Sequence, residues 1–141
     1  MKQIKKIVTL IGITLALFIF ANTSWATITL SQNSGYSYSD GGEFKAVTTG
    51  QEFVQNYATP AKLGDGFETF CVEAHVEFYP NQPYNFTVSS VDNEGRYLSI
   101  GTAYLYYQFS QGTLNGYNYN GDRASSAGAL QQAIWYLQGG Q

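Results

Sequence analysis

The single cysteine of this chain, Cys71, has the most distinctive chemistry, because a thiol can act as a nucleophile or cross-link to a second thiol. His75, the single histidine, lies four residues further on. Every even position from Phe70 to Phe78 is apolar, which predicts a half-buried strand. Four residues of strand span roughly 13 Å, whereas a catalytic Cys–His pair needs about 3 Å. We therefore do not expect Cys71 and His75 to form the nucleophile–base pair of a hydrolase.

Gln131 offers a second partner for the thiol. A cysteine thiol can attack a side-chain carboxamide buried beside it, which forms an internal thioester and releases ammonia; the site must exclude water. Gln131 lies at the edge of an apolar helical stripe formed by Ala127, Leu130, Ile134 and Leu137. Two other interpretations of Cys71 stay open, an inert buried thiol and a redox or cross-linking thiol. Gln131 would then be an ordinary residue at the boundary of the core.

Two short motifs resemble those of a known family. The segments Phe70–Val72 (Phe-Cys-Val) and Leu130–Trp135 (Leu-Gln-Gln-Ala-Ile-Trp) resemble the bacterial thioester domain of surface adhesins. That family has an aromatic-Cys-aliphatic motif on a strand and a later hydrophobic-Gln-x-Ala-aliphatic-Trp motif on a helix. The resemblance implies that Cys71 and Gln131 are the bonded pair, with Gln132 at the variable position. The same stretch is similar to small exported proteins of Gram-negative bacteria that carry a C-terminal sorting tail.

The resemblance also implies a function. The thioester would attach the protein covalently to amine groups on a host or matrix protein, or on another amine-bearing surface molecule, in cell-surface adhesion. A target lysine would displace Cys71 and leave an isopeptide link to Gln131. Because this event is a single turnover, we do not expect an enzyme, and no cofactor is implied. The alternative is a non-covalent structural or interaction protein of the extracellular matrix or biofilm, in which the 12 tyrosines mediate association and Cys71 is inert.

The N-terminus predicts export. Three lysines precede an uncharged apolar run from Ile7 to Phe20, and Ser24-Trp25-Ala26 offers a cleavage site after Ala26. We expect residues 1–26 to be a signal peptide and residues 27–141 to form a single thioester-like, β-rich domain that is secreted or held at the cell surface. No second apolar run reaches the roughly 20 residues of a membrane span, so no membrane partner is expected after cleavage.

Charge and residue types exclude several other functions. Three of the seven basic residues belong to the predicted signal peptide, and those that remain face ten acidic residues. Nucleic acids are bound by clustered cations, so we expect no nucleic-acid partner. One histidine, one cysteine and scattered carboxylates do not make a zinc site, and Asp40–Glu43 does not have the ligand spacing of a calcium loop. Glu73 and Glu77 are interpreted as a solvated strand face.

The pattern predicts an α+β fold: mainly an antiparallel β-sandwich or partly closed barrel, with two C-terminal helices packed on it. The helices are expected at about 100–111, with Ser99 or Thr102 as N-cap, and at about 123–138, with Asp122 or Ser125 as N-cap and Gly139-Gly140 as the stop. Turns are expected at Asp40-Gly41-Gly42 and in the loop Pro60–Gly66. Strands are expected at 27–30, 35–39, 43–49, 70–78 and 84–88.

Overall fold

The computed structural model describes residues 26–38, 41–49, 62–63 and 65–139. The predicted signal peptide, apart from Ala26, lies outside the described residues. Among the helices of the described part, none is both long and apolar enough to cross a membrane.

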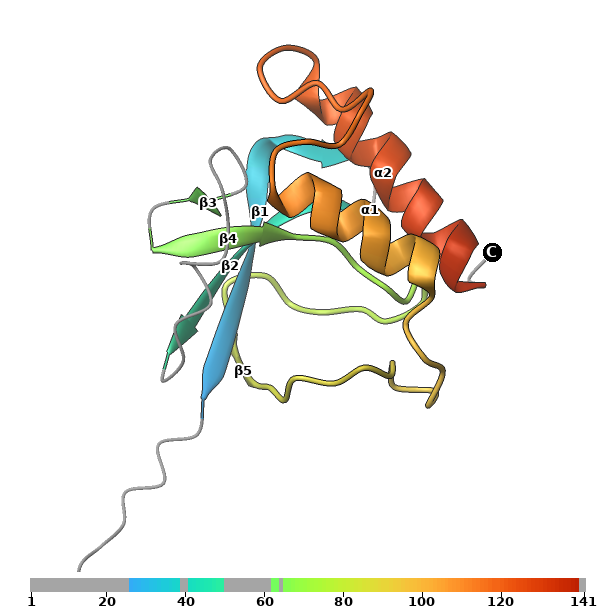
Figure 1. Ribbon diagram of the computed structural model, residues 1–141. Coiled ribbons are helices and arrows are strands. Elements are labelled where there is room, and N and C mark those ends of the chain that lie inside the picture. Colours follow the sequence, from blue (N-terminus) through green and yellow to red (C-terminus); the bar gives the residue numbers. More distant parts are fainter. Residues whose placement is uncertain (1–25, 39–40, 50–61, 64, 140–141) are drawn as a thin grey trace, which may run out of the picture.

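Five strands form one antiparallel sheet in the order β3-β4-β2-β1-β5 (Figure 1). The long strands at its centre are β1 (Thr27–Tyr38) and β2 (Gly41–Thr49), which pair along most of their length. The shorter strands are β3 (Lys62–Leu63), β4 (Gly66–Thr69) and β5 (Pro83–Asn85). The sheet is open, with β3 and β5 at its edges, and the described residues contain neither a closed barrel nor a second sheet.

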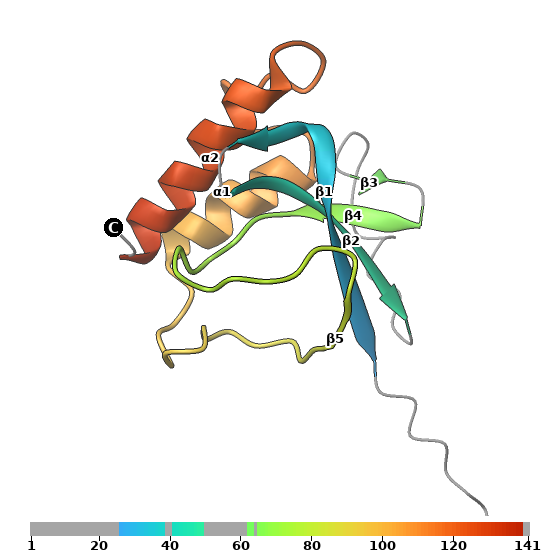
Figure 2. The ribbon, with the colours of Figure 1, turned by 180° about the vertical axis from the view of Figure 1, so that it is seen from behind.

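Two helices follow the sheet and cover one of its faces, so the α+β arrangement is confirmed (Figures 1 and 2). Helix α1 spans Ile100–Ser110 and has Ser99 as N-cap; its hydroxyl accepts a hydrogen bond from the Thr102 N–H. Helix α2 spans Arg123–Gln138 and has Asp122 as N-cap. It ends at Gly139, whose φ of 79° gives the left-handed conformation that commonly closes a helix.

The core lies between the helices and the sheet. Phe109 of α1 is fully buried and packs edge-to-face on Phe70, with ring centroids 5.0 Å apart. Leu130 and Ile134 of α2 belong to the same buried hydrophobic cluster as these two rings. Burial of such side chains contributes about 1.5–3 kcal/mol each, so the core fixes α2 against the chain that follows β4.

The strand predicted at 70–78 is wrong. The only strand of this region is β4, which ends at Thr69, and the chain then runs as a loop with a turn at Ala74 and His75. The strand predicted at 84–88 is present only as β5, which pairs with β1 and not with the preceding segment. Alternation alone does not make a strand, because a strand also needs a neighbouring edge for its backbone hydrogen bonds.

The other strand predictions are close to the structure. The strands predicted at 27–30 and 35–39 form one strand, β1, whose pairing with β2 changes register between Gln32 and Ser37. The strand predicted at 43–49 begins two residues earlier, at Gly41.

Candidate functional site

The carboxamide of Gln131 lies against the backbone of Cys71. Gln131 Nε2 donates a hydrogen bond to the Cys71 carbonyl oxygen at 2.7 Å, and the Cys71 N–H donates to Gln131 Oε1 at 3.0 Å. The Gly42 N–H donates to the same oxygen at 3.3 Å. Gln131 is only 1% exposed. The structure therefore brings together the two residues that the motifs single out, and backbone groups hold the carboxamide at three points.

Three elements meet at this site. Helix α2 supplies Gln131 from its buried face, Cys71 follows the end of β4, and Gly42 lies at the start of β2. The neighbouring Phe70 is anchored in the core against Phe109, which fixes the backbone of Cys71 from one side. The position of the carboxamide thus depends on how α2 packs on the sheet.

Two consecutive glycines let β2 approach the carboxamide. Gly42 has a φ of 112°, a backbone conformation that residues other than glycine rarely adopt. A β-carbon on Gly41 would lie 2.5 Å from Cγ of Gln131, closer than non-bonded carbon atoms come, and 3.0 Å from Cη2 of Trp135, which is a tight contact. The glycines that the sequence marks as a turn therefore also make room for Gln131.

Cys71 itself is half-buried, and burial raises the pKa of its thiol. The sulfur therefore keeps its proton at neutral pH. The residue lines a cavity of about 490 Å³ together with His75, Glu77 and Phe78. The thiol is thus near a space that a small molecule or side chain can occupy.

The two N–H groups that reach Gln131 Oε1 have a chemical consequence. When a nucleophile adds to a carboxamide or thioester carbon, negative charge develops on the carbonyl oxygen. Preorganised backbone donors aimed at that oxygen stabilise the charge, and one such donor is worth about 10²–10³ in rate. The N–H groups of Cys71 and Gly42 are in place to do this at Gln131.

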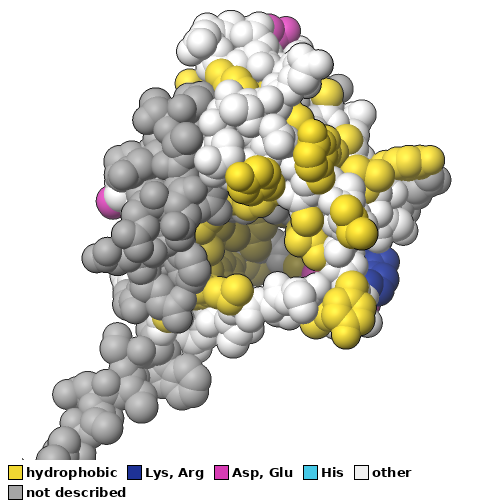
Figure 3. All heavy atoms as spheres, in the orientation of Figure 1, with side chains coloured by type: hydrophobic (Ala, Val, Ile, Leu, Met, Phe, Trp, Pro, Cys, Tyr) yellow, Lys and Arg dark blue, Asp and Glu magenta, His cyan; other side chains and the backbone are white. Residues whose placement is uncertain are grey.

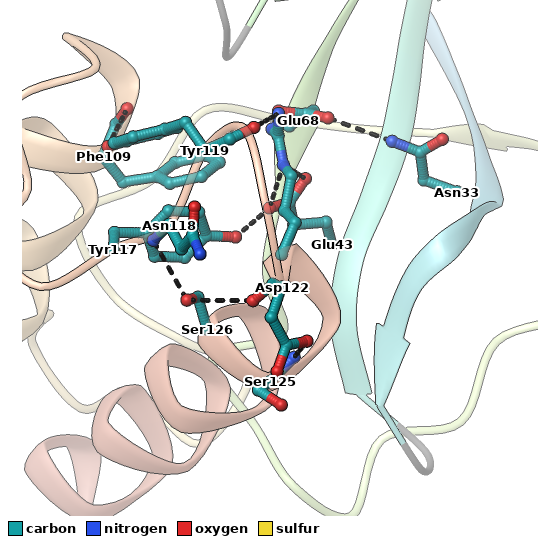
Figure 4. Close-up of polar contacts among 11 residues, drawn as sticks. Asn33, Glu43, Glu68, Phe109, Tyr117, Asn118, Tyr119, Asp122, Ser125 and Ser126 are labelled. Carbon is teal, nitrogen blue, oxygen red and sulfur yellow. Dashed lines mark hydrogen bonds and ion pairs between the residues drawn. The ribbon is translucent and has the colours of Figure 1, made fainter.

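A buried ion cluster, formed by Glu43, Glu68 and Arg123, lies close to this site (Figure 4). Both glutamates are 0% exposed and Arg123 is 5% exposed. Arg123 Nε is 2.9 and 3.1 Å from the two carboxylate oxygens of Glu43, and Arg123 Nη2 donates to Glu68. The Tyr117 hydroxyl donates to Glu43, and Asn33 Nδ2 donates to Glu68 at 3.0 Å. The cluster is therefore held by hydrogen bonds from several elements.

The ion cluster joins the same elements that build the carboxamide site. Glu43 directly follows Gly42 in β2, and Glu68 of β4 precedes Cys71 by three residues. Arg123 begins the helix that carries Gln131. One guanidinium thus links the start of α2 to both strands, which makes the ion cluster a clamp on the geometry around Gln131.

The charges of the ion cluster do not balance if both carboxyls are ionised. Burial, together with the hydrogen bond and the negative charge of Glu43, raises the pKa of Glu68 to about 8, against the opposing effect of Arg123. Glu68 therefore rests largely protonated at neutral pH, and one cation faces one anion.

Sequence reasoning missed the ion cluster and the role of Gly42. The members of the ion cluster are 25 to 80 residues apart in pairs, so no local spacing identifies them. The scarcity of charge is the one available signal, since charged residues make up 12% of the chain and Arg123 sits at the first position of a predicted helix.

The remaining acidic candidates, Glu73 and Glu77, lie in different surroundings. Glu73 accepts hydrogen bonds from the Asn93 backbone and side chain, the latter at 2.7 Å. It lines a different cavity from Glu77, so the two do not share one strand face. The described residues contain no group of three His, Cys, Asp or Glu side chains that could hold a metal ion.

Comparison with known proteins gives no relative for this arrangement: no family model, curated protein or solved structure matches the chain.

Proposed function

We propose that this chain is an exported thioester domain that attaches covalently to amine groups on a host or matrix target at the cell surface. Cys71 is the nucleophile that forms the thioester, and Gln131 supplies the acyl carbon. The domain reacts once, forming a stable amide with its target.

The placement of the Gln131 carboxamide carries this proposal. A glutamine that is 1% exposed could be satisfied by any polar neighbour, yet its three hydrogen bonds go to the backbone of Cys71 and to Gly42. A buried carboxamide held against the backbone of a cysteine, with its oxygen polarised by two N–H groups, has features that acyl transfer requires.

The bond-forming step balances without a cofactor. Cys71 Sγ attacks Gln131 Cδ, and the developing negative charge on Oε1 faces the N–H groups of Cys71 and Gly42. The C–N bond then breaks, and the thiol proton leaves with the amide nitrogen as ammonia. Because burial raises the pKa of the Cys71 thiol, the sulfur carries this proton at the start of the reaction.

The intact mass of the mature protein tests the proposal. We expect a mass that is lighter than the sequence by one ammonia, and a gain of one methylamine at Gln131 after incubation with that amine. Cys71→Ala should have the full sequence mass and take up no methylamine. A wild-type protein of full mass, with Cys71 free to alkylate and no amine adduct, would contradict the proposal.

A second prediction concerns the glycine that faces Gln131. In Gly41→Ala, the new methyl group overlaps Gln131 Cγ, so the carboxamide must move away from Cys71. We expect the free energy of unfolding to fall by about 1–3 kcal/mol, and the fraction of molecules with the ammonia deficit to drop. Urea unfolding and intact mass measure the two effects. Gly95→Ala strains the backbone of a distant loop, where φ is 78°, but its β-carbon meets no atom within 4 Å; it should lower stability and leave the mass deficit unchanged.

One observation favours the alternative, a non-covalent interaction protein. Tyrosines of the helical region are strongly exposed: Tyr97 is 78% exposed, Tyr136 68%, and Tyr104 and Tyr107 59% each. Figure 3 shows hydrophobic side chains gathered around a hollow on one face of the molecule, with few charged groups among them. Exposed aromatic surface of this kind is typical of binding sites. Target binding that is unchanged in Cys71→Ala and reversible in denaturant would support this function.

A further inference from the structure

The cavity beside Cys71 is lined by groups suited to a lysine side chain. Its volume is about 490 Å³, and its lining includes His75, Glu77 and the apolar residues Phe44 and Phe78. The titratable side chains that line it, within the described part of the chain, are those of Cys71, His75 and Glu77. The cavity thus offers one carboxylate, one imidazole and an aromatic wall next to the thiol.

The path of the chain explains why His75 is here. A continuous strand would carry His75 roughly 13 Å away from Cys71. Instead the chain leaves the sheet after β4, turns at Ala74 and His75, and returns to β1 (Figure 2), where the Asn81 N–H donates to the Leu30 carbonyl at 2.8 Å. With the predicted strand broken, His75 and Cys71 line the same cavity.

We propose that this cavity is the site for the attacking lysine, with His75 as the general base and Glu77 as the group that recognises the ammonium. This inference rests on the proposed thioester function and adds to it the substrate site and the proton acceptor. The aliphatic part of the lysine lies against Phe78, as long cationic side chains do on apolar surfaces.

The proton transfers balance as follows. The bound ammonium first gives one proton to solvent, and its nitrogen lone pair attacks Gln131 Cδ of the thioester. His75 takes a second proton from the attacking nitrogen as the C–N bond forms. The C–S bond breaks, and the Cys71 thiolate recovers that proton from the imidazolium. An imidazole suits this role because it changes protonation readily near neutral pH.

Three probes separate the parts of this proposal. Nα-acetyl-lysine-N-methylamide has the ammonium group and the aliphatic part of a lysine side chain, and its attack requires a base. Methylamine has the ammonium group and also requires a base, but it lacks the aliphatic part. Hydroxylamine is uncharged at neutral pH and a strong nucleophile, so it needs neither Glu77 nor His75. The rate of each adduct is followed by intact mass in the wild type, His75→Gln and Glu77→Gln, with Glu94→Gln as the matched carboxylate control on an exposed loop.

The expected results differ between variants. His75→Gln should slow capture of the lysine derivative and of methylamine by about 10²-fold. Glu77→Gln should raise the concentration of the lysine derivative that gives half-saturation by about two- to fivefold, as expected for loss of an exposed ion pair. Hydroxylamine should react at the wild-type rate in every variant, and Glu94→Gln should match the wild type with all three probes.

The mass before amine addition shows which proposal fails. A wild-type protein without the ammonia deficit would overturn the thioester function, and this site with it. If the deficit is present in all proteins but His75→Gln and Glu77→Gln capture the lysine derivative at the wild-type rate, the cavity is not the lysine site. His75 and Glu77 are both exposed, so their replacement should not disturb the core. A variant that still shows the ammonia deficit has kept the fold that forms the thioester.

Discussion

Replacement of Arg123 by methionine is expected to lower the free energy of unfolding by about 3–5 kcal/mol, which is the usual cost of removing one partner from a buried ion pair. Arg123 is 5% exposed and binds Glu43 and Glu68, which are themselves fully buried. Methionine fills part of the volume but leaves Glu43 without a cation in a site that water does not reach. Urea unfolding of Arg123→Met and the wild type measures the difference.

Two variants calibrate this result. Arg123→Lys keeps the charge but not the fork that reaches two carboxylates through separate nitrogens, so its stability should fall between those of the wild type and Arg123→Met. Lys45→Met removes an exposed ion pair with Asp65, which is 3.0 Å away, and should change stability little.

Arg123→Met should also disturb the position of the Gln131 carboxamide. Arg123 begins the helix that carries Gln131 and links it to the strands that lead to Gly42 and Cys71. Under conditions where Arg123→Met is still folded, we expect a smaller fraction of molecules with the ammonia deficit than in the wild type. Equal urea midpoints for Arg123→Met and the wild type would show that the ion cluster does not hold these elements together.

The helices were predictable because their signals are local. Ser99 and Asp122 accept hydrogen bonds from the backbone N–H groups of the first turn, and Gly139 closes α2. Each of these contacts involves residues close in sequence, so the residue types alone predict them. The apolar stripe of α2 likewise predicts the buried side of the helix at Ala127, Leu130 and Ile134, and Gln131 lies on that side. It is wrong at Leu137, which is 39% exposed near the end of the helix.

The strand predicted at 70–78 fails for a reason that no local pattern contains. At Cys71 the N–H and the carbonyl, which would join a neighbouring strand, bind the Gln131 carboxamide from a helix 60 residues away. The aromatic residues at the two ends of the segment are covered, but by different partners: Phe70 packs on Phe109 and Phe78 packs on Phe44. Val76 between them is 49% exposed. Alternation thus predicted burial correctly at Phe70 and Phe78 but not at Val76, and it predicted the backbone partner wrongly.

The ion cluster also leads to a dependence of stability on pH. In the unfolded chain Glu68 loses its proton near its ordinary pKa of 4.5, whereas in the folded protein it holds the proton up to about 8. Between these values the unfolded state binds fewer protons than the folded state, so the free energy of unfolding falls as pH rises. The contribution of Glu68 is complete below its unfolded pKa and is lost as pH rises through the folded one. Each pKa unit corresponds to about 1.4 kcal/mol, so we expect a loss of a few kcal/mol.

Glu68→Gln isolates this effect from the other titrating groups. Glutamine cannot ionise, so the difference in unfolding free energy between the wild type and Glu68→Gln should shift against the wild type as pH rises from about 5 to about 8. Urea unfolding at a series of pH values gives that difference. Any loss of stability that Glu68→Gln causes at every pH shifts the difference by a constant and does not change its slope. A flat difference for Glu68→Gln would mean that Glu68 is ionised in the folded protein, and that Arg123 alone balances both buried carboxylates.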